Sequence, residues 1–80
     1  METAAPTVLW RLFTKLGHRR LGEGGDHAHA VMLPGGPPYT LALFSNEHMD
    51  RVENFDTLEI ALFRADGIKQ SLVTDGWVEE

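Results

Sequence analysis

The sequence contains no cysteine, and its 80 residues leave little material for a core. Without cysteine, disulfide bonds and thiolate metal sites are excluded. A domain of this size obtains only a few kcal/mol from its core, so small proteins add a metal, a disulfide or a partner. Stability must therefore come from a modest core, from histidine or carboxylate metal ligands, or from self-association as a homo-oligomer such as a homodimer. The lack of cysteine also suits a reducing compartment.

Basic residues are scarce as well, with 7 Lys and Arg against 12 Asp and Glu and a net charge of −5. Direct binding of nucleic acid is disfavoured, because contacts to phosphates need a basic surface. An acidic chain is better suited to contact a basic protein. No apolar run approaches the roughly 18 residues that cross a membrane, and the N-terminus lacks the features of a secretory signal. We therefore expect a cytoplasmic protein without a membrane partner.

The remaining composition is that of an ordinary globular protein. Hydrophobic residues make up 42% of the chain and charged residues 24%, close to the usual proportions. The length and composition predict a single small domain over 1–80. Its N-terminus, residues 1–5, is expected to be loose, and residues 22–26 are expected to form a Gly-rich connector.

The first periodic segment predicts a helix. Proline is tolerated in the first turn of a helix, which is where Pro6 would lie. The apolar residues that follow are spaced i, i+1, i+4, i+5 and i+8, which forms one stripe on a helix: Val8, Leu9, Leu12, Phe13 and Leu16. We expect a helix from Pro6 to about Leu16.

Two alternating segments then predict a hairpin. In the segment from His27 to Leu33, one side would carry His27, His29, Val31 and Leu33. Pro34–Pro38 has the composition of a loop, and Tyr39–Phe44 alternates again. For residues 45–56 two interpretations remain, one or two helical turns and an irregular link.

The C-terminal part predicts a second hairpin. Thr57–Arg64 and Ile68–Val73 both alternate, and a three-residue loop over 65–67 segregates the apolar side chains best. In that register Phe63 lies on the polar face, and Trp77 with Val78 adds a short final pairing. The predicted fold is α+β, with the N-terminal helix packed on a four-stranded, mostly antiparallel sheet made of two hairpins.

Histidines form one candidate site. On a strand, His27 and His29 would project from the same face about 7 Å apart, and His48 or Asp26 would supply a third metal ligand. This predicts a small metal-binding or ligand-binding protein. Two surface histidines on an edge strand, which need no ligand, account for the same pattern.

Catalytic machinery is not indicated. Neither of the two serines, Ser45 and Ser71, lies in a nucleophile-elbow pattern. A domain this small also has little room for a substrate pocket of several hundred Å³. We expect a protein that is not an enzyme and has no cofactor.

Acidic residues recur every three positions at Glu47, Asp50, Glu53 and Asp56. On a helix they would form a negative ridge that fits a basic groove, although a solvated face has the same pattern. With the exposed Phe63 as an apolar contact, they predict a non-catalytic protein-binding module that docks on a basic, nucleic-acid-binding partner. In size and charge, though in no sequence motif, the chain is similar to phage and mobile-element inhibitors, including anti-CRISPR proteins. An accessory subunit of a larger complex is the alternative.

Overall fold

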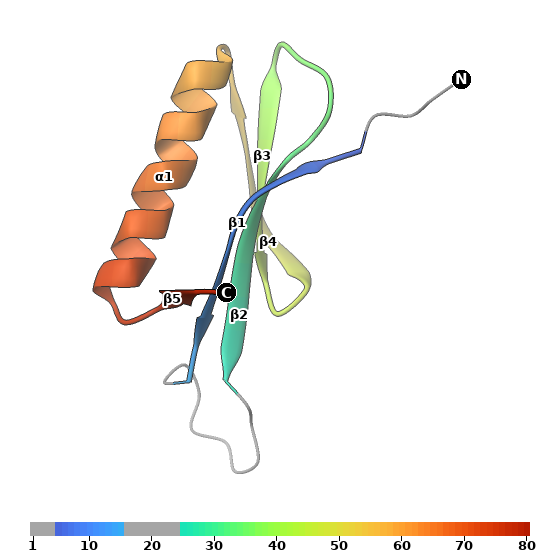
Figure 1. The fold of residues 1–80 in the computed structure, drawn as a ribbon. Helices are drawn as coiled ribbons and strands as arrows, with labels where there is room; N and C mark the ends of the chain where they lie inside the picture. The colour runs from blue at the N-terminus through green and yellow to red at the C-terminus, as the bar shows by residue number, and fades with distance from the viewer. Residues whose placement is uncertain (1–4, 16–24) are drawn as a thin grey trace.

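The computed structural model describes residues 5–15 and 25–80. One helix covers one face of a five-stranded sheet with the strand order β4-β3-β2-β1-β5, in which all neighbours are antiparallel (Figure 1). The α+β class is confirmed. The elements are β1 (Thr7–Thr14), β2 (Asp26–Met32), β3 (Tyr39–Ser45), β4 (His48–Phe55), α1 (Leu58–Thr74) and β5 (Val78–Glu79). No helix of these residues is long and apolar enough to cross a membrane.

The predicted N-terminal helix is wrong, because this segment forms β1. Trp10, Leu12 and Thr14 alternate with more exposed residues and are buried, which is the period of a strand. The register shifts between Val8 and Trp10 in the pairing with β2, so Leu9 is an extra residue in a bulge. The bulge places two apolar residues in succession, and this is what imitated the spacing of a helix. Leu16, the predicted end of that helix, lies outside the described residues.

The predicted first hairpin is confirmed as β2 and β3, which pair in an antiparallel register. The loop over 34–38 is also confirmed. Most of the expected Gly-rich connector, residues 22–24, and most of the loose N-terminus, residues 1–4, lie outside the described residues. Asp26, the last residue of that connector, already belongs to β2.

The segment for which two interpretations remained is a strand, β4, joined to β3 by a tight turn. Asn46 and Glu47 occupy the turn, both with positive φ, as a two-residue hairpin turn requires. The Asn46 side chain accepts a hydrogen bond from the backbone N–H of His27 at 2.8 Å and donates one to Asp26 Oδ1 at 2.9 Å. The side chain of one turn residue therefore fastens the β3–β4 turn to the start of β2.

The predicted second hairpin is also wrong, since residues 58–74 form the single helix α1. Thr57 has extended backbone angles and its hydroxyl accepts from the N–H of Ile60 at 3.2 Å, which makes it the N-cap. Ala61 and Ala65 are buried against the sheet, and Ile68 and Leu72 pack beside them. These four residues follow the spacing i, i+4, i+7 and i+11 of a helix stripe.

The core lies between α1 and the sheet. It contains the buried residues Trp10, Leu12, Ala30, Met32, Leu41, Leu43, Ala61 and Ala65. The indole Nε1 of Trp10 donates to the carbonyl of Ala65 at 3.0 Å, which ties the helix to β1. Because only alanines of α1 are fully buried, the helix can approach the sheet closely.

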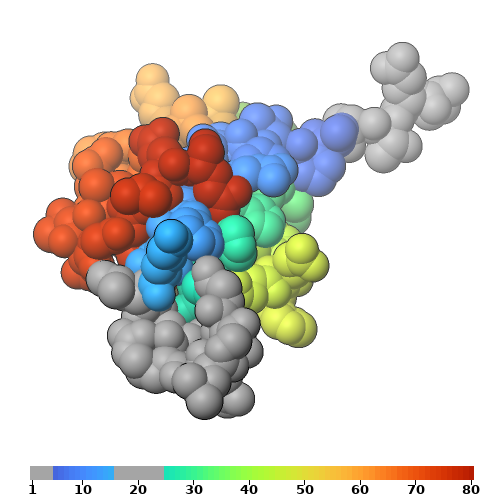
Figure 2. All heavy atoms as spheres, turned by 60° about the horizontal axis from the view of Figure 1, so that its bottom comes forward, coloured from blue at the N-terminus to red at the C-terminus, as the bar shows by residue number. Residues whose placement is uncertain are grey.

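After α1 the chain returns to the sheet at the edge opposite β4. The expected short final pairing is present in β5 but begins one residue later, since Val78 pairs with Phe13 and Glu79 with Leu12 of β1, while Trp77 lies outside the strand. Figure 2 shows this C-terminal segment, in dark red, lying against β1, in blue. Glu79 also pairs with Lys69 of α1 at 2.5 Å, so β5 is held by both layers.

Candidate interaction surfaces

The sheet face turned away from α1 carries two of the three predicted metal ligands. His27 pairs with Phe13, and His29 pairs with Phe44. Directly paired residues share a face of an antiparallel sheet. His48 pairs with Ser45, which pairs with Ala28, and Ala28 packs on the core. His48 therefore faces the α1 side, opposite the other two histidines.

The predicted metal site is thus not assembled. Among residues 5–15 and 25–80 there is no group of three His, Cys, Asp or Glu side chains that could hold a metal ion. Each of the two histidines on β2 has another contact: His27 Nδ1 lies 2.6 Å from Glu80 Oε2, and the His29 ring stacks on Phe44 with centroids 4.6 Å apart. The Asp26 carboxylate is bonded to Asn46.

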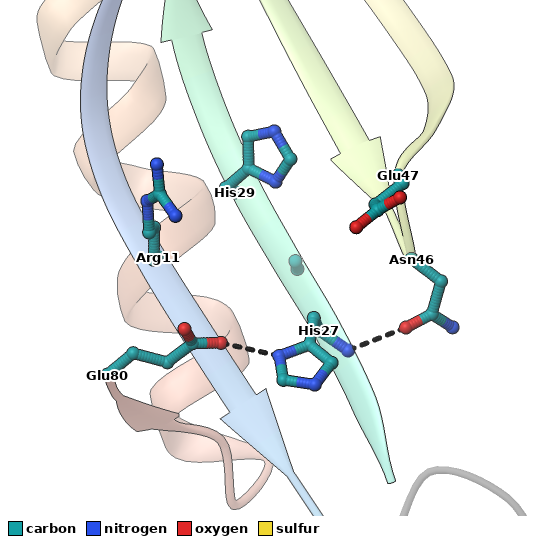
Figure 3. A pocket seen from close by; sticks show the side chains of 7 residues that line it. Arg11, His27, His29, Asn46, Glu47 and Glu80 are labelled. Carbon is teal, nitrogen blue, oxygen red and sulfur yellow. Dashed lines mark hydrogen bonds and ion pairs between the residues drawn. The ribbon is translucent and has the colours of Figure 1, made fainter.

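A shallow pocket of about 300 Å³ opens on this face (Figure 3). Arg11, His29 and Glu47 lie across its upper part, and Glu80 and Asn46 flank His27 below, while α1 passes behind the strands. The pocket brings the Arg11 guanidinium, two imidazoles and the carboxylates of Glu47 and Glu80 together, and it is open to solvent. Sequence reasoning missed Arg11 and Glu80 here, because Arg11 was placed in a helix and Glu80 reaches His27 only through the return of β5.

The predicted acidic ridge is divided by the strand. Glu53 faces α1 and pairs with Arg64 at 2.9 Å and with Arg51 at 3.3 Å. The hydrogen bond from Arg64, assisted by that from Arg51, holds the pKa of Glu53 below its ordinary value despite some desolvation. Glu47 lies in the turn and Asp50 is the extra residue of a bulge in β4. Asp56 lies in the connection between β4 and α1.

The outer face of α1, which is the side turned away from the sheet, is a second surface that no other described element covers. Phe63 is 81% exposed. At about 100° per residue it points roughly opposite to the stripe formed by Ala61 and Ala65. Around it on this outer face lie Glu59, Ile60, Asp66 and Gly67, of which Ile60 is 53% exposed. Phe63 is exposed, although for a different reason from the hairpin register that predicted it.

The open face of the sheet, the face without α1, is mixed, because apolar side chains share it with Arg11, His27, His29, Thr40 and Asn54. The pairing registers place seven apolar residues there: Val8, Phe13, Val31, Ala42, Phe44, Met49 and Val52. Antiparallel sheets with one packed face usually turn polar side chains to the other. The alternation within β1 could have revealed this face, had the bulge not obscured it.

Comparison with known proteins does not assign the chain to a family. No protein-family model, curated protein or solved structure matches it.

Proposed function

We propose that the chain is a non-catalytic protein-binding module that docks on a larger basic partner through the outer face of α1. The observation that carries this proposal is Phe63. A phenylalanine that is 81% exposed and directed away from the core contributes little to folding. Aromatic residues are common anchors of interfaces, where they fill apolar pockets of the partner.

The charges around Phe63 indicate the character of the partner. Glu59 and Asp66 lie four residues before and three residues after it, so they are its neighbours on the helix surface. Both are exposed, and neither forms an ion pair within the described part of the chain. A partner with an apolar pocket rimmed by Lys or Arg would complement this surface. Nucleic-acid-binding proteins carry such basic surfaces, and a module of this kind would act on them as a competing inhibitor.

This proposal changes the residues that carry the contact. Phe63 on α1 and Asp56 just before it remain from the predicted set, and Glu59 and Asp66 of α1 are added to them. Glu53 is neutralised by its two arginines, which makes it a structural residue. A metal-binding function is not proposed, because the histidines on β2 and β4 face opposite sides of the sheet.

Quantitative capture of partners from a lysate of the source cells tests the proposal. The comparison is between the wild type, Phe63→Ser, Asp66→Lys and the control Val73→Ser. Val73 is also apolar, exposed and on α1, about 15 Å along the helix from Phe63. Losing the burial of one phenylalanine, worth about 1.5–3 kcal/mol, weakens binding roughly 10- to 150-fold.

We expect one protein to bind both the wild type and Val73→Ser. The same protein should bind Asp66→Lys weakly and Phe63→Ser not at all, and its binding to the wild type should weaken as the salt concentration increases. Equal retention by Phe63→Ser would refute the outer face of α1 as the contact surface. Retention of no protein by the wild type would refute the proposed function.

A further inference from the structure

The open face of the sheet requires its own explanation, because α1 covers only the opposite face. Three of its apolar side chains are substantially exposed, Val8 at 42%, Met49 at 56% and Val52 at 46%. They belong to two strands, β1 and β4, on either side of the face, while Val31 and Ala42 between them are buried. Exposed apolar side chains gathered on one face of a small acidic protein favour an interface.

Two charged residues flank this face and have no ion-pair partner within residues 5–15 and 25–80. Arg11 extends from β1 and Glu47 from the β3–β4 turn. Figure 3 shows them on either side of His29, Arg11 toward the β1 edge and Glu47 toward the β4 edge. One face therefore presents a free cation near one edge and a free carboxylate near the other.

We propose that a second copy of this chain covers the open face, related by a twofold axis that runs along the strands between the two sheets. This axis places β1 of one copy over β4 of the other, so that each Arg11 approaches the Glu47 of the second copy. The interface is isologous, and every contact is made twice. A twofold axis across the strands would instead bring the two Arg11 residues together, so these charges select one orientation.

The dimensions of the face predict a weak dimer. Four strands about 4.8 Å apart, each of about seven residues at about 3.3 Å, give a flat area of roughly 440 Å². A standard stable interface buries about 800 Å² on each partner. Dimerisation is therefore expected in the upper micromolar range. The two helices would lie on the outside of an α/β/β/α arrangement, so the outer face of α1 stays free in both copies.

Sedimentation equilibrium of the full chain, from about 10 µM to about 1 mM, tests the proposal by a charge exchange. Arg11→Glu and Glu47→Arg are both substitutions of exposed residues. Each alone places like charges together and should raise the dimer dissociation constant by about tenfold or more. In the double variant, Arg11→Glu with Glu47→Arg, the two charges are opposite again but have exchanged positions. Its dimer dissociation constant should return to within about threefold of that of the wild type.

Two further variants separate this interface from the surface proposed for the partner. Val52→Lys places a charge within the open face and should abolish dimerisation, with a circular dichroism spectrum that shows the fold is kept. Phe63→Ser lies on the other side of the molecule and should leave the dissociation constant unchanged. Val52→Lys, although monomeric, should still bind the protein that docks on α1. A failure of the second-copy proposal can therefore be told apart from a failure of the proposed function.

Three results would overturn the second-copy proposal. The first is a monomeric wild type at all these concentrations, which would leave the open face to another partner. The second is a dimer that is indifferent to Val52→Lys and to the charge exchange. The third is loss of the dimer in Phe63→Ser, which would mean that the copies meet through α1.

Discussion

Gly67 offers a direct test of whether the outer face of α1 is free. It is the tenth residue of a 17-residue helix, where glycine is about 0.8–1.0 kcal/mol less favourable than alanine. A Cβ added at this position meets no atom within 4 Å, and the backbone is helical. Gly67→Ala should therefore raise the free energy of unfolding by about 1 kcal/mol and Tm by about 4–8 °C.

The control is Gly35→Ala in the loop between β2 and β3. An added Cβ there also meets nothing within 4 Å, but φ is +96°, which an L-residue with a side chain adopts only with strain. Gly35→Ala should lower the free energy of unfolding, so the same added methyl group has opposite effects. Urea denaturation with far-UV circular dichroism measures both. A destabilised Gly67→Ala would refute the reasoning, because it would mean that α1 packs against something on its outer side.

Three other substitutions test how the fold is held together. Asn46→Ala removes the two side-chain hydrogen bonds from the β3–β4 turn to β2, including that to the buried Asp26, and keeps the backbone bond from Asn46 N–H to the carbonyl of His27. Urea denaturation should show a loss of about 1–3 kcal/mol. Thr57→Ala removes the N-cap of α1 and should lower the unfolding free energy by about 1 kcal/mol, whereas Thr57→Ser should not. Because the hydrogen bond from Arg64 holds the pKa of Glu53 below its ordinary value, this pair stabilises the fold above the ordinary pKa of a glutamate and stops doing so as the pH falls through the lowered pKa. In Arg64→Gln, NMR should show the pKa of Glu53 moving back up toward its ordinary value, and an unchanged titration would contradict the assigned cause.

The hairpin of β2 and β3 could be predicted from sequence because its signals are local and agree. The Pro-Gly loop over 34–38 interrupts two short alternating segments, and the two strands pair as expected. Nothing distant in the chain has to be known to place this unit. The glycine turn before Trp77 also indicated a short final strand, but its partner, β1 at the other end of the chain, could not be read from local signals.

The helix could not be predicted in the same way because tertiary packing determines its inward side. Its buried stripe begins with Ala61 and Ala65, which are small, whereas the larger Ile60, Leu62 and Phe63 are exposed. The large residues imitate the alternation of a strand, and Asp66-Gly67 within the helix resembles a hairpin turn. The helical spacing over 61–72 is present in the sequence, but two of its four residues are alanines, which contribute little to a hydrophobic periodicity.

The outer face of α1 and the open face of the sheet differ in how much of each could be predicted from the sequence. Phe63 stood out because the predicted hairpin register placed it on the polar face, although that hairpin is wrong and the segment is α1. The open face depends on the registers of four strands and on two bulges, one in β1 and one in β4. Long-range pairing of this kind leaves no short motif, so it becomes visible only when the strands are placed beside one another.

The proposed function depends most on Phe63, which must serve binding and not folding. The decisive measurement is the affinity of Phe63→Ser for the purified captured partner, made beside its free energy of unfolding. We predict an affinity lower by roughly tenfold or more and an unfolding free energy within about 0.5 kcal/mol of the wild type. An unchanged affinity, or a loss of affinity that is matched by loss of the fold, would contradict the claim.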